Sequence, residues 1–472
     1  MKYSKFIHHF LFNRVIKMDR KIYRKFLFSA ALLLFCLLFI APTNSQDKTQ
    51  RYFELENGLK IYLYEKHTLP LVNLVFAVNL GTKDESDETS GLVHILEHYI
   101  LFRGTEFRSG PEISQDIRRH GAYFNAHTSL DLATFEISLP SEHVDFALRN
   151  QKEILFNLKL SQEELDEEKK VILEELSQAR DDPIKHATSL VYQNLFKDHP
   201  YQKPVQGKKE IIEALTVDQV EKFYRKFFVS SNCVLAIVGD FEIEEMEKKT
   251  KDILGNLKKE EISTSKYEKA PALKKTVEIK QEMDVNQAYL VIGILGPDYN
   301  HKDQYAMDIL IQILGRGVNP MLNIPLRGRR NLAQSVLMNY GAHKYGGAII
   351  IYITLDPKNI SITKRETIKF LKETTRLKYS KKDVMGDAQL YALDYLESAK
   401  NQIKFDFHQS QEKGLAVATS IARYLILNQN QEGGSYIENI EKLNSLDLWK
   451  AAGKYLSKGC YVIVTISPKK KK

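Results

Sequence analysis

The sequence predicts an α+β fold of two tandem homologous domains, each a largely antiparallel sheet with helices packed on one side, forming a clamshell. In each half, β-rich runs such as 71–79 and 348–355 accompany long helical patterns such as 162–180. Two similar apolar segments, 231–239 and 458–466, each follow an amphipathic helical stretch. This repetition of a helix and a strand indicates a duplication, so we expect both halves to share one topology.

The segment between the halves, 257–275, has few large apolar residues, dense charge and a proline, as expected of a solvated linker. We therefore place the N-terminal domain at 46–256 and the C-terminal domain at 276–472. Residues 1–45 predict a signal peptide, because the uncharged run 26–42 follows a basic segment and is shorter than the roughly 18 residues of a membrane span. The chain is expected to be exported and periplasmic or extracytoplasmic; an uncleaved leader acting as a membrane anchor is the alternative.

The charge of the 472-residue chain, +8, lies mostly in this leader. Residues 1–45 hold eight Lys and Arg and one acid, so the remainder falls from 68 bases and 60 acids to 60 and 59. A nearly neutral body has no basic stripe, which excludes nucleic acid as a partner. Beyond the leader the cysteines are Cys233 and Cys460, and two so far apart predict buried free thiols.

The segment 87–100 opens with capping residues and continues in an apolar helical pattern. On a helix, His94 and His98 lie one turn apart on the same face, so their ring nitrogens can converge on one ion. Glu97 lies beside them. The pattern H-x-x-E-H is the inverted zinc peptidase motif, in which the histidines bind zinc and the glutamate activates water. The alternative is two histidines on the polar face of an ordinary amphipathic helix.

A catalytic zinc site normally has three protein ligands, so the motif predicts a third ligand elsewhere. The helix over 162–180 begins with an S-x-x-E capping box at Ser161 and carries Glu168 and Glu175 on nearly the same face. Two such carboxylates can offer a metal ligand and a supporting partner. The alternative is that the many acids of this helix face water.

Five motifs, spread over the first half, together resemble the insulinase and pitrilysin superfamily of zinc metallopeptidases. The similarity is to the branch that includes the mitochondrial processing peptidase subunits and their bacterial relatives. The motifs are GLVHILEHYILFRGT at 91–105, GAYFNAHTSLD at 121–131, EKKVILEE at 168–175, HPYxxPVxG at 199–207 and NCVLAIVGD at 232–240. The second half resembles the family's non-metal domain, because 309–315 takes the place of the motif helix without His or Glu.

The resemblance implies Zn²⁺ held by His94, His98 and Glu175. It also implies that Glu97 is the general base and Glu168 a supporting carboxylate. Zinc in such a site lowers the pKa of water, and the base then moves the proton to the leaving amine.

Asn125, expected on a strand over 121–136, matches the position that contacts the substrate backbone. That strand would bind peptide by β-augmentation, in which main-chain hydrogen bonds give affinity and side chains are selected weakly. His127 and His199 are interpreted as structural or substrate-side groups, because the ligand set is complete without them.

In the second half, the catalytic branch of the family has an arginine and, seven residues later, a tyrosine that reach the substrate carbonyl. Here Arg327 is present, but Gln334 stands at the tyrosine position. Three interpretations remain: Gln334 substitutes for the tyrosine, Tyr340 reaches the site, or a partner chain completes it. A further alternative is that Arg327 belongs to a solvated basic patch.

These observations predict an exported zinc-dependent endopeptidase that hydrolyses short or unfolded peptides. The resemblance further implies a homodimer, or a heterodimer with a paralogous subunit that lacks the zinc motif. The alternative function is a non-catalytic or partner-dependent peptide-binding subunit of a heterodimeric peptidase.

Overall fold

The computed structural model describes residues 49–260, 262, 266–317, 319–328, 330–383, 394–427 and 436–469. The predicted signal peptide lies outside these residues. From Arg51 onward the chain forms one compact unit. Within the described ranges, none of the helices has both the length and the apolar character that crossing a membrane requires.

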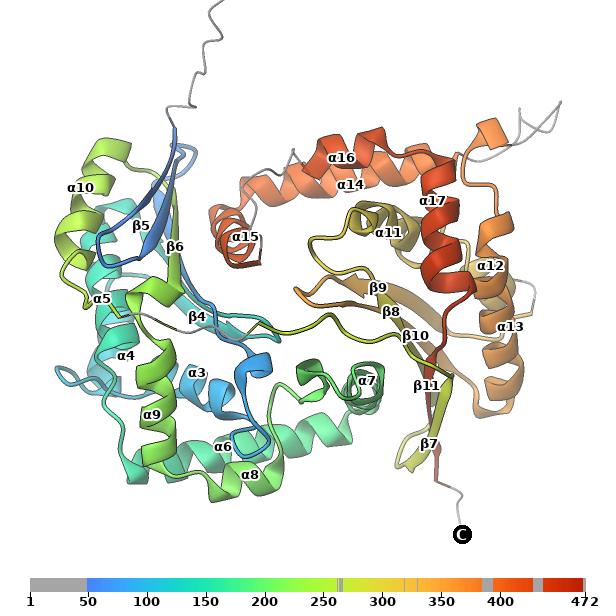
Figure 1. Cartoon of the computed structure of the whole chain (residues 1–472), viewed down its shortest axis with the longest axis horizontal. Coiled ribbons are helices and arrows are strands. Elements are labelled where there is room, and N and C mark those ends of the chain that lie inside the picture. Colours follow the sequence, from blue (N-terminus) through green and yellow to red (C-terminus); the bar gives the residue numbers. More distant parts are fainter. Residues whose placement is uncertain are drawn as a thin grey trace, which may run out of the picture. The chain divides into compact units, whose positions relative to one another are not determined.

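Two sheets organise the fold (Figure 1). The first has the order β1-β2-β6-β3-β5-β4 and comprises β1 (Gln50–Glu54), β2 (Lys60–Glu65), β3 (Leu71–Val78), β4 (Tyr123–Thr128), β5 (Ala133–Pro140) and β6 (Cys233–Gly239). The second has the order β7-β11-β8-β10-β9 and comprises β7 (Val277–Met283), β8 (Ala288–Gly296), β9 (Ser335–Gly341), β10 (Gly347–Leu355) and β11 (Val462–Pro468). In both sheets the last strand of the half is inserted parallel to one neighbour and antiparallel to the other. The predicted α+β tandem repeat is confirmed.

The helices of the first half are α3 (Leu92–Phe102), α4 (Gly110–Arg119), α5 (Val144–Phe156), α6 (Gln162–Asp181), α7 (Pro183–Leu195), α8 (Lys209–Ala214), α9 (Val217–Phe227) and α10 (Ile243–Leu254). Those of the second half include α11 (Asp303–Ile311), which continues as the π-helical turn η5 (Gln312–Arg316), α12 (Asn323–Arg327), α13 (Ile360–Glu373), α14 (Tyr395–Glu412), α15 (Gly414–Leu427), α16 (Tyr436–Lys442) and α17 (Ser445–Ala451). The predicted helix at 162–180 is α6. One bond of the predicted capping box is present, because the Ser161 hydroxyl accepts a hydrogen bond from Glu164 N at 3.3 Å, while the hydroxyl itself donates to the Glu164 carboxylate at 3.0 Å.

Each sheet packs helices of its own half on one face and a helix of the other half on the opposite face. α7 contributes Val191 to a core formed with β8, β10 and β11. The approach is close, because a Cβ on Gly293 of β8 would lie 2.2 Å from a Val191 methyl carbon. Reciprocally, α15 contributes Ala418 and Ala422 to a core with β3 and β6. The two halves therefore exchange helices across their sheets.

The predicted single strand over 121–136 is wrong, because the chain turns within it. β4 and β5 pair as an antiparallel hairpin in which Asn125 lies opposite Glu136. At the turn, the Ser129 hydroxyl donates to Leu132 O at 2.7 Å, while Ser129 N donates to the same oxygen at 3.0 Å. The hairpin makes β4, which carries Asn125, the last strand of its sheet.

The described part of the predicted linker is irregular and largely exposed, and it also contacts both halves. Glu268 O accepts a hydrogen bond from His199 Nε2 at 3.1 Å, and Ala270 N donates to Tyr345 O at 2.7 Å. Lys269 forms a 2.7 Å ion pair with Asp298. Two backbone polar groups of this irregular segment are thus paired with protein groups.

A buried polar network joins the halves beside the linker. The Tyr201 hydroxyl donates to the Asp131 carboxylate and accepts a hydrogen bond from Tyr345 N at 3.1 Å. The other Asp131 oxygen accepts one from Lys344 N at 3.0 Å. The H-P-Y motif thus contributes to this junction, in which His199 contacts the linker and Tyr201 contacts the second half.

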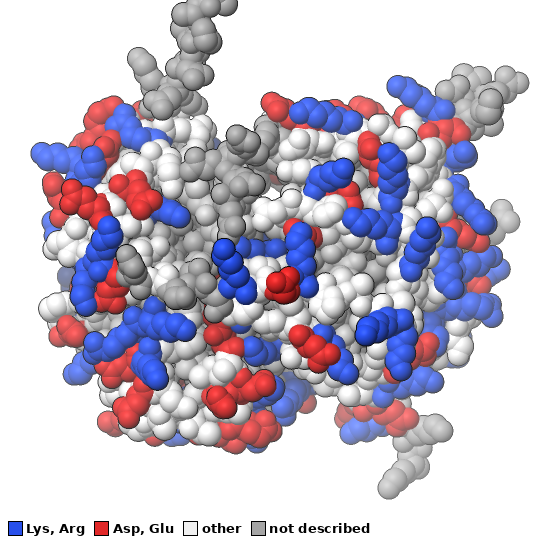
Figure 2. All heavy atoms as spheres, in the orientation of Figure 1, with Lys and Arg blue, Asp and Glu red and all other residues white. Residues whose placement is uncertain are grey.

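Both cysteines that the structure describes are free, as predicted. Cys233 is buried, whereas Cys460 is only partly buried. Charged residues of both signs are interspersed over the face shown in Figure 2, and neither sign forms a continuous stripe there.

Candidate metal centre

The helix that carries the H-x-x-E-H motif, α3, is fixed at its start by a buried carboxylate. Gly91, with φ 97°, precedes the first helical residue, and its position has no side-chain cap. Instead, the Glu85 carboxylate accepts hydrogen bonds from Gly91 N at 3.1 Å and Val93 N at 3.0 Å. Burial raises the pKa of Glu85 to about 8, although these two N–H groups oppose the shift. The prediction that residues within 87–90 cap the helix is therefore wrong; Glu85 does so because its carboxylate folds back onto the helix start.

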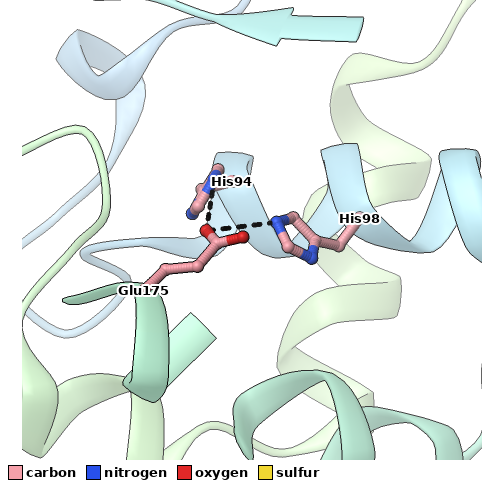
Figure 3. A group of neighbouring side chains, drawn as sticks. All are labelled: His94, His98 and Glu175. Atoms are coloured by element: carbon pink, nitrogen blue, oxygen red, sulfur yellow. Dashed lines mark ion pairs between the residues drawn. The ribbon is translucent and has the colours of Figure 1, made fainter. Parts of the chain in front are cut away.

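The structure brings His94 and His98 of α3 together with Glu175 of α6 (Figure 3). One oxygen of Glu175 lies 3.7 Å from His94 Nε2 and 3.6 Å from His98 Nε2. The three potential ligand atoms lie within 4.8 Å of one another. The arrangement arises because α3 and α6 pack against each other, and each presents the polar part of its surface to the other.

The distances in this cluster fit ligands that share an ion better than ligands that bond to each other. Separations of 3.6 and 3.7 Å exceed an ordinary hydrogen bond. For metal bonds of about 2.0–2.1 Å, two corners of a tetrahedral zinc site lie about 3.3 Å apart, so the two separations from Glu175 need to shorten only slightly. Two imidazoles and one carboxylate are also a donor set that zinc accepts while keeping a position for water.

A second layer of side chains holds His98. Its Nδ1 lies 3.1 Å from one oxygen of the buried Glu168, and the other Glu168 oxygen accepts a 2.6 Å hydrogen bond from Arg103 Nε. Arg103 also pairs with Glu167 at 2.9 Å. Glu168 therefore orients the imidazole so that Nε2 faces Glu175. The sequence analysis did not single out Arg103. The clue was Glu168: a carboxylate that supports a metal ligand from a buried position needs a second hydrogen-bond partner.

The two histidines differ in their electrostatic surroundings. Burial lowers the pKa of His94 to about 4, and its buried Nδ1 has no hydrogen-bond partner among the residues that the structure describes. For His98 burial also lowers the pKa, but the hydrogen bond with Glu168 and the charges of Glu175, Glu168 and Glu97 outweigh it and leave the pKa raised. The carboxylates therefore create a field at His98 that favours a positive charge.

Glu97 is half-buried beside the cluster and is not one of its three members. Burial raises its pKa, while Thr128 at the end of β4 and the nearby His98 and His127 oppose the shift. A carboxylate with a raised pKa is better able to accept a proton near neutral pH.

The predicted substrate residue Asn125 lies on β4 with Tyr123 and His127 on the same face of the strand. Its amide donates to the Tyr123 hydroxyl at 3.1 Å and lies 3.4 Å from His127 Nε2. Tyr123 and His127 are exposed. This row of polar side chains follows the open edge of the first sheet, on the strand that ends beside Glu97.

The other two predicted site residues lie in the second half, at the end of α12 and just before β9. Arg327 and Gln334 are exposed. Among the residues that the structure describes, neither side chain forms a hydrogen bond or ion pair with the cluster. Tyr340, the alternative to Gln334, donates its hydroxyl to Pro297 O at 2.8 Å and is half-buried, so it is committed to its own half.

Paired α+β repeats of which only one carries an H-x-x-E-H helix define a two-domain metallopeptidase architecture. Comparison with known proteins agrees. Residues 60–209 match the family model described as insulinase (peptidase family M16), and residues 214–385 match the model described as peptidase M16 inactive domain. The chain belongs to the insulinase (peptidase M16) family.

Similar curated proteins include an uncharacterized zinc protease of Rickettsia bellii, 26% identical over 86% of this chain and 94% of the relative. The zinc protease PqqE of Helicobacter pylori is 26% identical over 88% of this chain and 92% of its own length. Among solved structures, a protease from Helicobacter pylori superposes with a TM-score of 0.80 at 24% identity, covering 89% of this chain and 99% of that one. The periplasmic protease PqqL from Escherichia coli gives 0.72 at 17% identity, covering 90% of this chain and 48% of its own. These structures share the fold.

Proposed function

We propose that this chain is an exported zinc-dependent endopeptidase that hydrolyses short or unfolded peptides. One observation carries the proposal: a single Glu175 oxygen lies almost equally far from the Nε2 atoms of His94 and His98, at 3.7 and 3.6 Å. Residues of two separate helices thus converge on one point. The names of the relatives, which are zinc proteases, support the same assignment.

His94, His98 and Glu175 would hold the ion. When bound, Zn²⁺ supplies Lewis acidity, which polarises a carbonyl and makes water more acidic. Glu97, outside the ligand set, accepts a proton from the attacking water and passes it to the leaving amine. Glu168 keeps the His98 ring in the orientation that binding needs, because it occupies the Nδ1 atom.

The open edge of β4 is the proposed substrate surface. An extended peptide can add to this edge as a further strand, with its main chain paired to β4 and the Asn125 amide available for a backbone carbonyl. Recognition through the main chain selects weakly among peptide sequences. It requires an extended segment with free backbone groups, and folded proteins rarely offer one. We expect broad tolerance of peptide sequence at most positions.

The proposal is tested by metal analysis together with cleavage of a quenched peptide. We expect one zinc per chain. Glu97→Gln should retain zinc and lower the cleavage rate by about 10²-fold or more, because the proton acceptor is lost while the ligands remain. The matched control is Glu174→Gln, an exposed neighbour of the Glu175 ligand on α6. Full activity of Glu97→Gln, or purified chain that binds no zinc, contradicts the proposal.

A second candidate follows from Gln334, which replaces the expected tyrosine: a subunit that needs a paralogous partner, or a second copy, to complete its site. An amide is a weaker hydrogen-bond acid than a phenol, and loss of one such donor costs about 10²- to 10³-fold in rate. Gln334→Tyr should raise the cleavage rate of the isolated chain about 10-fold or more if this interpretation holds. An unchanged or lower rate favours a site that is complete without the tyrosine.

Export is proposed from the apolar segment 26–42 and the basic residues before it. Mass spectrometry of the chain recovered from cell fractions tests it. Recovery of full-length chain only from the cytoplasmic fraction contradicts it.

A further inference from the structure

A large cavity lies next to the candidate metal centre. Its volume is about 960 Å³, and it lies among the end of α6, the helix α7, the segment 202–210, His343 and β10. Two lining residues tie it to the centre: Leu176 follows Glu175 in the chain, and Thr128 influences Glu97. The three cluster residues do not line it. The cavity is therefore a neighbouring compartment in which part of a peptide bound at the centre can lie.

The inner lining of this cavity is largely apolar. The apolar and aromatic residues that line it are Leu130, Leu176, Ala179, Ile184, Leu190, Tyr192, Pro204, Val205 and Tyr352. Leu130 and Leu176 are buried. Such a lining offers apolar contacts to the side chains of a bound peptide.

The charged residues that line the cavity are mostly basic. They are Arg180, Lys185, Lys203 and Lys208, with Glu210 as the one carboxylate among its lining residues. Lys203 donates to Glu85 O, and Lys208 lies 3.4 Å from Asp87. Arg180 and Lys185 are exposed, and within the described ranges their side chains form neither hydrogen bond nor ion pair. Two cations are thus available to a ligand without breaking an existing interaction.

We infer that this cavity selects peptides that present a carboxylate beside the cleaved bond, with Arg180 and Lys185 as the recognising groups. The inference rests on the proposed function, since it names a substrate preference of the same site. A guanidinium binds a carboxylate through two parallel hydrogen bonds, and a second cation nearby adds to the attraction. The carboxylate comes either from an Asp or Glu side chain or from the C-terminus of a short peptide.

The experiment uses the full chain with Glu97→Gln, loaded with zinc, so that binding is measured without cleavage. Fluorescence anisotropy compares labelled peptides that differ only in having Glu, Gln or Lys at one position on either side of the expected cleavage bond. We expect the Glu peptide to bind about 10-fold more tightly than the Gln peptide at low salt, and the difference to shrink as salt rises. A second pair, with a free or amidated C-terminus, distinguishes a side-chain carboxylate from a chain terminus.

Variants of the two cations make the test specific. Arg180→Gln with Lys185→Gln should abolish the preference, and Arg180→Glu with Lys185→Glu should reverse it in favour of the Lys peptide. The matched control is Lys170→Glu with Lys222→Glu, which changes the total charge equally at exposed residues that do not line the cavity. Equal binding of Glu, Gln, free-acid and amidated peptides, or the same reversal in the control, overturns the inference.

The outcome is separable from that of the proposed function. Selective binding by a chain that never cleaves any peptide contradicts the proposed function and leaves the inference standing. Cleavage by the unmodified chain without preference for a carboxylate supports the proposed function and contradicts the inference.

Discussion

The helices α3 and α11 hold corresponding places in the two halves, and they differ in what they present. α3 lies between β3 and β4, and α11 with its η5 extension lies between β8 and β9, the equivalent strands of the second sheet. α3 presents the imidazoles of His94 and His98 to Glu175 of α6. The segment over α11 and η5 instead buries Ile309, Leu310, Ile313 and Leu314 in an apolar core.

The Asp308 carboxylate on α11 forms a hydrogen bond within the second half. It accepts a 2.9 Å hydrogen bond from the Tyr436 hydroxyl of α16. No histidine lies on α11 or η5. The same α+β scaffold therefore forms around α3, which carries the two potential metal-ligating histidines, and around α11, which carries no histidine. The candidate metal centre depends on a few side chains of α3 and α6.

The largest effect is expected from removing the carboxylate that completes the cluster. Glu175→Gln should lower zinc affinity by at least about 100-fold and reduce peptide cleavage to a similar degree, because an amide oxygen is a poor zinc ligand. Asp308→Asn in the second half is the matched change and should leave zinc content unchanged. Competition with a chromogenic chelator measures the zinc affinity of both variants. If Glu175→Gln binds zinc as tightly as the unmodified chain, Glu175 is not a ligand and the contrast between the two halves does not hold.

A smaller effect is expected at the second layer of α3. Arg103→Met removes the 2.6 Å hydrogen bond to Glu168, so the carboxylate that orients His98 loses its fixed position. Zinc affinity should fall by about 10-fold, within the range for outer partners of metal ligands. Arg119→Gln is the control, because the Arg119 ion pair with Asp116 lies on the surface, where the arginine side chain is 65% exposed. If both variants bind zinc alike, Arg103 has only a structural role.

The smallest expected effect concerns pH and the second half. Burial raises the pKa of Asp308 to about 6, above its ordinary value of 3.8. Between about pH 4 and 6 the folded chain keeps a proton that the unfolded chain has released, so the free energy of unfolding falls as pH rises through this window. Asp308→Asn removes this contribution. Between pH 4.5 and pH 7, the free energy of unfolding of this variant should therefore fall by about 1–2 kcal/mol less than that of the unmodified chain.

Urea unfolding at pH 4.5 and pH 7 measures the difference. The amide oxygen that Asp308→Asn introduces can still accept the hydrogen bond from the Tyr436 hydroxyl, so the native contact is preserved. Parallel changes in the two chains contradict a buried titrating carboxylate in this half.

The duplication, the main helices and the placing of His94 and His98 on one helix face were predictable, because helical spacing and strand patterns are local properties of the sequence. The convergence of Glu175 with this pair is a contact between two distant helices, and it was expected only from the resemblance to the family. The hairpin at Ser129 was not, since a serine side chain closes that turn without glycine or proline. Arg103 and Glu85 were missed for a related reason: their roles depend on which helix ends and carboxylates meet after packing. The anchoring of the linker was not predictable, because its polar composition does not show which of its backbone groups pair with the two halves after folding.

The exchange of α7 and α15 between the sheets has a consequence for biosynthesis. The helix that shields the second face of the first sheet is translated long after that sheet's last strand, so a ribosome carrying only the N-terminal portion displays an uncovered apolar surface. Such nascent chains are candidates for chaperone binding or for transport before they collapse. A gene cut at the linker should for the same reason yield fragments that aggregate singly and recover solubility when produced together.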